Sequence, residues 1–212
     1  MAKQLGRPVA SDGDERRRRI VDAARHQFAR AGYVGTTNRE IAEEAGITTG
    51  AIYHYFASKL DLYLAVFEDA DQRILERYDA VVGDPALAFD ERLAALLETS
   101  SQLNREDGTL ASFLAMASFE ALRNPDLRPS YQAHDKKMVQ FFEALVDQGV
   151  AEGAIDAAAD RREVLDAVRV LTLGLTWYAV RTQDPEAHRR ATHATVRLLR
   201  GQLVRTRRPR RS

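Results

Sequence analysis

Helical spacing between regularly placed turn residues is the feature that most restricts the fold of this chain. The strict alternation of apolar and polar residues that marks a half-buried strand is absent, and Ala, Leu, Glu and Arg dominate the segments. Turn residues interrupt these segments at "REDG", "RNPD", "EGAID" and "QDPEA". The pattern predicts an all-α protein with about nine helices.

The N-terminal segments carry clear helix start and stop signals. The first helix is expected to start near Asp14 and to end at Gly32. Thr37 is a favourable N-cap for the second helix, and Glu40, three residues later, completes a capping box. Gly46 is expected to end this short helix because glycine tolerates a positive φ.

Later helices follow from the same reasoning. A third helix, capped by Thr48, covers "ITTGAIYHYF", and a longer fourth helix starts at Ser58. The remaining helices are expected over roughly 88–105, 109–123, 126–152, 160–182 and 186–204.

This pattern suggests a small N-terminal head and a larger body. The expected parts are a disordered N-terminal arm (1–13), a helical head (14–73), a helical body (74–204) and a basic C-terminal tail (205–212). Charge follows a related division: residues 1–63 hold 10 Lys and Arg against 8 Asp and Glu, residues 64–199 hold 15 against 23, and residues 200–212 hold 6 against none. Basic ends around an acidic middle fit a polyanion-binding part joined to another part, although charge runs are also ordinary solvated surface.

Several classes of protein are disfavoured by what the sequence lacks. There is no cysteine, so disulfides and thiolate metal sites are excluded, and a reducing compartment fits. No uninterrupted apolar run approaches the length of a membrane span, and the charged start has no apolar segment behind it. We therefore expect a soluble cytoplasmic protein without cofactor, metal or membrane partner.

Residues 37–56 have the form of a helix-turn-helix, in which two short helices cross at a tight turn. Ile41, Ala45, Ile47 and Ile52 can form the small core that holds the two helices together, with Ala42 small enough to permit a close crossing. A hairpin of this size also occurs inside helical bundles, so the turn alone is weak support for DNA binding.

The detailed sequence resembles the head of the TetR family of bacterial transcriptional regulators over residues 14–73. The matching positions of "TTNREIAEEAGITTGAIYHYFASKLDLY" are Thr37, Ile41, Ala42, Ala45, Gly46, Ile47, Thr48, Ile52, Tyr53, Tyr55, Phe56, Ser58, Lys59 and Leu62. Upstream, the similar positions are Ile20, Ala23, Ala24, Phe28, Gly32 and Tyr33. The body resembles the family only in its length and helicity.

The resemblance implies phosphate contacts at the helix-turn-helix. Thr37 and Thr48 sit at helix N-termini, where hydroxyl and backbone N–H groups favour a phosphate. Tyr53 can present its hydroxyl from the third helix, and Lys59 can pair with the DNA backbone as a point charge. Phe56 is expected to be a packing residue.

Base readout has fewer candidates in this segment. Thr49, Gly50, Ala51 and His54 are expected to face the groove, and Arg39 can reach a base or a phosphate. Because the third helix lacks Arg, Lys, Asn and Gln, specificity is expected to depend on thymine methyl groups and DNA shape. "LGRP" near the N-terminus and "RTRRPRRS" at the C-terminus are further candidates for minor-groove and phosphate contacts.

The last two helices are the expected dimer seam, because one small head would make few base contacts. The predicted interface residues are Val164, Val168, Leu171, Leu175, Tyr178, Ala191, Thr195 and Leu198. A wholly intramolecular core is the alternative for this stripe.

Large apolar side chains in the body are candidates for an effector pocket, which the resemblance places among the middle helices. The predicted lining residues are Phe113, Met116, Phe119, Phe141, Trp177 and Tyr178. An apolar or aromatic small molecule is the expected effector.

The leading hypothesis is therefore a homodimeric repressor that binds a pseudo-palindromic double-stranded operator and responds to a small molecule. Two other classes stay open: a helical enzyme with an active site in the body, and a helical interaction adaptor that binds no DNA. The enzyme hypothesis has little support, because the five histidines are scattered and no His-Glu metal motif, phosphate loop or nucleophile elbow is present.

Overall fold

The computed structural model describes residues 12–84 and 86–203, and all regular secondary structure within these ranges is α-helical. The helices are α1 (Asp12–Gly35), α2 (Asn38–Ala45), α3 (Thr49–Tyr55), α4 (Lys59–Val82), α5 (Phe89–Glu106), α6 (Gly108–Arg123), α7 (Arg128–Ala151), α8 (Arg161–Thr182) and α9 (Pro185–Leu199). The all-α prediction is confirmed. "LGRP", "RTRRPRRS" and nearly all of the two expected tails lie outside the described residues, whereas α1 begins at Asp12, slightly earlier than expected.

Local capping signals form the head as expected. Thr37, Thr48 and Ser58 are the N-caps of α2, α3 and α4, and each side chain accepts a hydrogen bond from a backbone N–H of its first turn. Gly32 adopts a φ of 72° and interrupts the regular helix where the sequence predicts an end, and one further helical turn then runs to Gly35. A side chain at Gly32 would also collide with Glu120 of α6, since an added Cβ would lie 2.6 Å from Oε1.

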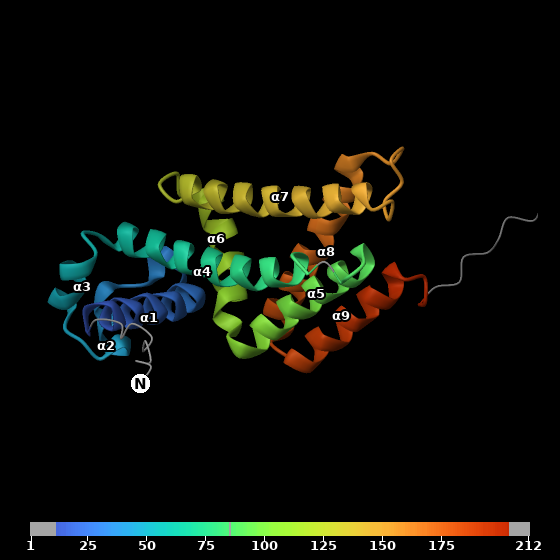
Figure 1. Cartoon of the computed structure of the whole chain (residues 1–212). Coiled ribbons are helices and arrows are strands. Elements are labelled where there is room, and N and C mark those ends of the chain that lie inside the picture. Colours follow the sequence, from blue (N-terminus) through green and yellow to red (C-terminus); the bar gives the residue numbers. More distant parts are fainter. Residues whose placement is uncertain (1–11, 85, 204–212) are drawn as a thin grey trace, which may run out of the picture.

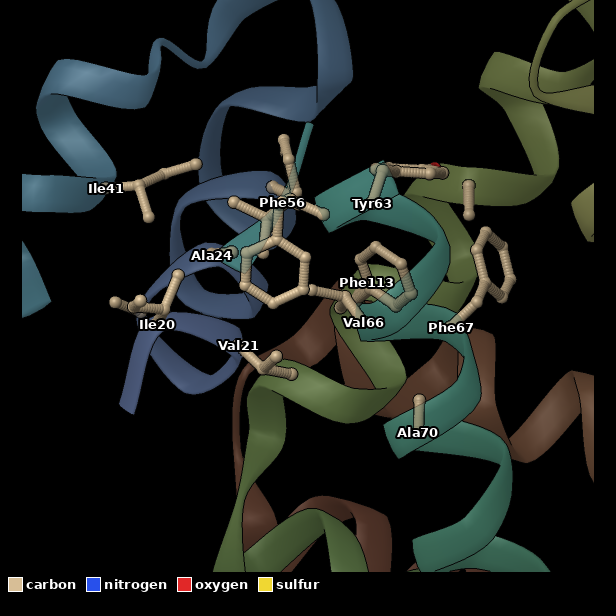
Figure 2. Close-up of a cluster of buried hydrophobic side chains, with 14 of the residues drawn as sticks. Ile20, Val21, Ala24, Ile41, Phe56, Tyr63, Val66, Phe67, Ala70 and Phe113 are labelled. Atoms are coloured by element: carbon tan, nitrogen blue, oxygen red, sulfur yellow. The ribbon is translucent and has the colours of Figure 1, made fainter. Parts of the chain in front are cut away.

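A single apolar core joins the head to the body. Figure 2 shows Ile20 and Ala24 of α1, Ile41 of α2, and Tyr63 and Val66 of α4 within one cluster of buried side chains. Burial of these side chains holds the first helices against α4 by the hydrophobic effect. The head is therefore fixed to the body by packing as well as by chain connectivity.

Phe113 of α6 completes this core with edge-to-face ring contacts. Its ring centroid lies 5.3 Å from that of Tyr63 and 4.9 Å from that of Phe67, and Phe28 lies 4.9 Å from Tyr63 on the other side. Such arrangements match the negative face of one ring with the positive edge of the next. A body helix thus contributes a central aromatic residue to the core of the head.

The helix α4 runs without interruption from the head into the body (Figure 1). Its 24 residues span ~36 Å at 1.5 Å per residue, so the expected boundary between residues 73 and 74 falls inside a continuous helix. In Figure 1, α1, α2 and α3 surround one end of α4, α5, α8 and α9 lie near the other end, and α7 runs above α4 at the top of the view.

Two smaller apolar clusters hold the body together. One joins α4, α5, α7 and α8, and the other joins α5, α8 and α9. The helix α9 ends at Leu199, before the expected residue 204. Within the described residues, no helix has both the length and the apolar composition needed to cross a membrane.

Candidate functional site

The turn between α2 and α3 has the geometry of a helix-turn-helix. Gly46 adopts a φ of 66°, and its N–H bonds to the carbonyls of Ala42 and Glu43 at the end of α2. Ile47 then donates its N–H to the carbonyl of Ala42 at 3.0 Å. A Cβ at position 46 would meet open space, so the positive φ alone explains the preference for glycine.

The predicted small core of the helix-turn-helix is present. Ile41 and Ile52 are fully buried, Ala42 is nearly so, and Ala45 and Ile47 pack against them half-buried. These contacts fix the angle between α2 and α3, and therefore fix which face of α3 remains outside.

The helix α3 exposes the residues that the sequence predicts to face DNA. Tyr53 is 56 % exposed, and His54 is exposed with its ring edge-on to Tyr55 at 5.3 Å. Gly50 is exposed, and a Cβ there would meet nothing within 4 Å. Thr49 and Ala51 are half-buried beside it, whereas Phe56 is buried, as expected of a packing residue. The DNA contacts themselves stay predictions.

Thr37 forms a complete capping box with Glu40, so its hydroxyl already has hydrogen-bond partners within the protein. Its hydroxyl donates to Glu40 Oε2 at 2.8 Å and accepts from the Glu40 N–H at 3.3 Å. Hydrogen bonds from the backbone and side chain of Thr37 hold the pKa of Glu40 below its ordinary value. Arg39 is exposed, and its Nε donates to Glu43 at 2.9 Å.

Lys59 makes intramolecular contacts that the sequence did not predict. Its Nζ donates to the backbone carbonyls of Tyr33 at 2.7 Å and Thr36 at 2.8 Å, and it lies 4.5 Å from the centroid of the Tyr33 ring. Burial lowers the pKa of Lys59, although the neighbouring carboxylates of Glu120 and Glu40 oppose this shift. Two of the three ammonium donors are therefore used to tie α4 to the end of α1, and only the third could reach a phosphate.

The body contains a partly open cavity of about 240 Å³ between α4, α5, α6, α7 and α8 and the first turns of α9. Its lining residues are Ile74, Tyr78, Ser100, Leu103, Asn104, Leu110, Ala111, Leu114, Ala115, Ser118, Tyr131, His134, Asp135, Met138, Phe142, Arg169, Thr172, Leu173, Thr176, Trp177, Ala179 and His188. The lining is largely apolar, as is typical of small-molecule sites. We refer to this space as the body cavity.

Of the six residues predicted to line an effector pocket, only Trp177 lines the body cavity. Phe113 lies instead in the core shared with the head, and Phe141 packs behind the cavity wall against Tyr78 and Phe142. The other three, Met116, Phe119 and Tyr178, are at least a third exposed. Large apolar residues were a poor guide because the wall that α6 presents to the cavity consists of Leu110, Ala111, Leu114, Ala115 and Ser118.

Most charged groups around the body cavity are paired. Arg169 donates to Asp135 at 2.9 Å, His134 contacts Asp71, and Lys137 donates to Asp71 at 2.8 Å. Burial disfavours ionisation of Asp71, but the hydrogen bonds from His134 and Lys137 outweigh it and hold its pKa below the ordinary value. No functional role for these residues was predicted from the sequence.

The helix α6 is linked to the head by polar contacts near both of its ends. At its N-terminus, the buried Arg25 of α1 donates to Asp107 at 2.6 Å and to Thr109 at 3.0 Å. Toward its C-terminus, Glu120 accepts hydrogen bonds from the Tyr33 N–H and, at 3.1 Å, from the Tyr63 hydroxyl. The same helix lines the body cavity, so a displacement of α6 would be felt directly by α1.

The predicted dimer seam is only partly exposed in the single chain. Val168 and Leu175 are buried in the body core, which corrects their assignment to a subunit interface. Val164, Leu171, Ala191 and Thr195 are half-buried. The apolar side chains that α8 and α9 expose are Val170, Leu173, Trp177, Tyr178, Leu198 and Leu199, of which Tyr178 and Leu198 were predicted. Most of the apolar side chains that α8 exposes therefore lie on a different face of the helix from the stripe that was predicted as the interface.

Comparison with known proteins gives a consistent result. Residues 20–66 match the model of a family described as bacterial regulatory proteins, tetR family. The HTH-type transcriptional regulator SrpR of Pseudomonas putida is 23 % identical over 184 residues, which cover 86 % of this chain and 84 % of that protein. The HTH-type transcriptional repressor KstR2 of Mycolicibacterium smegmatis is 28 % identical over 173 residues, covering 80 % of each chain.

Solved structures share the whole arrangement of helices. The transcriptional regulator FadR from Bacillus subtilis, solved in complex with stearoyl-CoA, superposes with a TM-score of 0.76 at 21 % sequence identity. The match covers 88 % of this chain and 99 % of that one, so the similarity of fold extends through the body.

Proposed function

Because the chain belongs to the TetR family of bacterial transcriptional regulators, we propose that it is a homodimeric repressor that releases a pseudo-palindromic operator when a small, largely apolar molecule binds the body. DNA-binding regulation is the function of the family. The dimer, the release and the class of effector are our proposal.

The contacts of α6 are the observation that carries the proposed release. One face of α6 lines the body cavity, and Asp107 and Glu120 near its two ends bind the head through Arg25, Tyr33 and Tyr63. A ligand that shifts α6 must therefore shift α1 or break these bonds. Such a ligand favours one spacing of the two heads only if it binds more tightly to the protein conformation that has this spacing than to the other conformation.

A dimer is supported by the exposed apolar face of α8 and α9. Val170, Leu173 and Leu198 are about half exposed or more, and Trp177 is 39 % exposed. Exposed clusters of large apolar residues commonly mark association surfaces. A two-fold dimer would place two α3 helices for symmetric half-sites, which is the usual way in which a small helix-turn-helix reads a long operator.

An apolar effector is supported by the lining of the body cavity, in which Leu103, Leu110, Leu114, Met138 and Phe142 take part. The related FadR structure holds stearoyl-CoA, a molecule with a long hydrocarbon chain. Both observations favour a ligand with a substantial apolar part over a polyanion alone.

An enzymatic function has no comparable support. The curated relatives are regulators, and the charged groups that line the body cavity, Arg169 with Asp135 and His134 with the adjacent Asp71, are engaged with one another. Within residues 12–84 and 86–203, we identify no nucleophile paired with a base in this cavity.

The proposal is tested by selecting bound duplexes from a random DNA pool and then titrating apolar compounds against the selected operator. We expect an operator with two symmetric half-sites and at least one compound that weakens binding without unfolding the protein. A single asymmetric half-site would contradict the dimer. An operator affinity that no compound changes would contradict the sensor role while leaving DNA binding intact.

A further inference from the structure

His188, in the first turns of α9, is a buried polar residue that faces the body cavity. His188 is only 2 % exposed, and it is one of the residues that line the cavity. Neither Nδ1 nor Nε2 has a hydrogen-bond partner among the described parts of the chain. A buried polar atom without a partner is uncommon in folded proteins and calls for an explanation.

The helix itself does not need an imidazole at this position. Ala187, Thr192 and Val196 occupy the same buried side of α9, and they pack as small or apolar groups. The Thr192 hydroxyl donates to the backbone carbonyl of His188, so that contact would survive replacement of the ring. A leucine could fill the same space without leaving buried nitrogens unpaired.

The surroundings keep the imidazole uncharged. Burial lowers the pKa of His188, and the positive charge of the nearby Arg105 lowers it further. A neutral imidazole has one nitrogen that donates and one that accepts. It therefore suits a hydroxyl group, which can accept from the N–H or donate to the bare nitrogen, better than it suits an anion.

The remainder of the body cavity also favours an uncharged ligand. Of the charged residues that line it, Arg169 and Asp135 neutralise each other, and His134 is held by Asp71. From Arg169 to Ala179 the cavity follows α8 for eleven residues, which is a rise of ~15 Å along the helix. An elongated apolar molecule can occupy this length, with its polar group at the end that contains His188 and Ala179.

We propose that His188 is the polar recognition residue of the body cavity, and that the effector is an uncharged, mainly apolar molecule whose hydroxyl group hydrogen-bonds to this imidazole. The inference rests on the proposed function in taking the body cavity as the effector site, and it adds the residue and the chemical class of the ligand.

The test uses three rigid probes that differ at one end: biphenyl, 4-phenylphenol and biphenyl-4-carboxylate. Trp177 is the only tryptophan of the chain and lines the cavity, so its fluorescence reports binding without DNA. We expect 4-phenylphenol to bind about tenfold more tightly than biphenyl, since a hydrogen bond to a buried group otherwise unpaired is worth about that factor. The carboxylate should bind most weakly.

The variant His188→Leu should remove the preference for the phenol and leave the affinity for biphenyl unchanged or higher. His188→Gln, which keeps a donor and an acceptor, should restore part of the preference. His193→Leu changes an exposed histidine of the same helix and is the matched control, which should behave as the unmodified protein. Thermal unfolding of His188→Leu should occur at the same or a higher temperature, because no protein hydrogen bond is lost.

Equal affinity of the unmodified protein for biphenyl and the phenol would overturn the inference. So would tightest binding of the carboxylate, absence of binding by all three probes, or a preference for the phenol that persists in His188→Leu. Binding of the probes is measured without DNA, so the two proposals can fail separately. If the phenol binds through His188 but leaves operator affinity unchanged, the regulatory proposal fails and the assignment of His188 stands.

Discussion

Arg25 of α1 and Asp107 at the N-cap of α6 form an ion pair with 2.6 Å between Nη2 and Oδ2. The two residues are 82 positions apart in the chain, and Arg25 is only 2 % exposed. Asp22 and Asp69 also accept from the same guanidinium, at 3.0 and 3.1 Å. One buried cation thus joins α1, α4 and the start of a helix that lines the body cavity.

Replacing Arg25 by methionine should lower the free energy of unfolding by about 3 kcal/mol, because it leaves partly buried carboxylates without their cation. Urea denaturation measures this change. Arg30→Met, at an exposed position of the same helix, is the control and should change stability by less than about 0.5 kcal/mol. Equal stability of the two variants would show that the buried ion pair contributes nothing.

Stability should fall in acid in a way that depends on Asp71. Its pKa is lower in the folded protein than in the unfolded chain, so the folded state binds fewer protons. The contribution is therefore fully present above the ordinary carboxylate pKa of about 3.9 and is lost as the pH falls through the lower folded value. Asp71→Asn should lose stability at neutral pH and show a shallower decline between about pH 5 and pH 2, measured by urea denaturation at each pH. An unchanged slope would argue against the shift.

Lys59 and Tyr53 should affect different properties. Lys59→Ala removes two hydrogen bonds to the carbonyls of Tyr33 and Thr36, so it should lower the free energy of unfolding by about 1–2 kcal/mol. Tyr53→Phe should leave stability unchanged and weaken operator binding by about fivefold, through loss of a phosphate contact. Denaturation and operator titration distinguish the two effects. Full operator affinity in Tyr53→Phe would remove the support for the phosphate contact of Tyr53.

The lack of Arg, Lys, Asn and Gln in α3 leads to a prediction about the operator. Replacing its thymines by uracils removes only the methyl groups, and it should weaken binding by about 1 kcal/mol at contacted positions. Operator titration at fixed salt is the measurement, because affinity for DNA varies steeply with salt. Replacement of thymines in the flanking DNA provides the control. Unchanged affinity would mean that neither Thr49 nor Ala51 reads a thymine methyl group.

The exposed face of α8 should be needed for dimer formation. Val170→Glu places a charge on this face without touching the body cavity, so the folded protein should become monomeric and bind the operator at least tenfold more weakly. Sedimentation reports the mass of the assembly. Lys136→Glu on the exposed side of α7 is the control and should remain dimeric. A dimer that survives in Val170→Glu would place the interface elsewhere.

Signals that act over a few residues were sufficient to predict the head. The capping box of Thr37 and Glu40, the positive φ of Gly46 and the N-caps Thr48 and Ser58 all appear where the sequence predicts them. Each is a local hydrogen bond or backbone conformation, so its energy is decided almost independently of the rest of the chain. The break at Gly32 was anticipated for the same reason, although not the helical turn that follows it.

Residues whose neighbours are distant in the sequence could not be assigned in this way. An apolar stripe reveals that a helix face is buried but not which partner buries it. Val168 and Leu175 were therefore assigned to the interface between two subunits, although they pack in the core of a single chain. Phe113 was placed in a ligand pocket, whereas it completes the core of the head. Lys59 was predicted to pair with the DNA backbone, which stays a prediction, but its contacts with the carbonyls of Tyr33 and Thr36 could not be foreseen from the sequence.

The sequence by itself determined the helical class, the helix-turn-helix and the exposed face that α3 presents, because these depend on periodicity and on caps within a few residues. Only the tertiary structure decided the position of the body cavity, the pairing of Arg25 with Asp107 and the isolation of His188. These depend on which side chains meet between distant positions, such as the 82 that separate Arg25 from Asp107, and many alternative packings satisfy the same apolar pattern until the helices are placed in space.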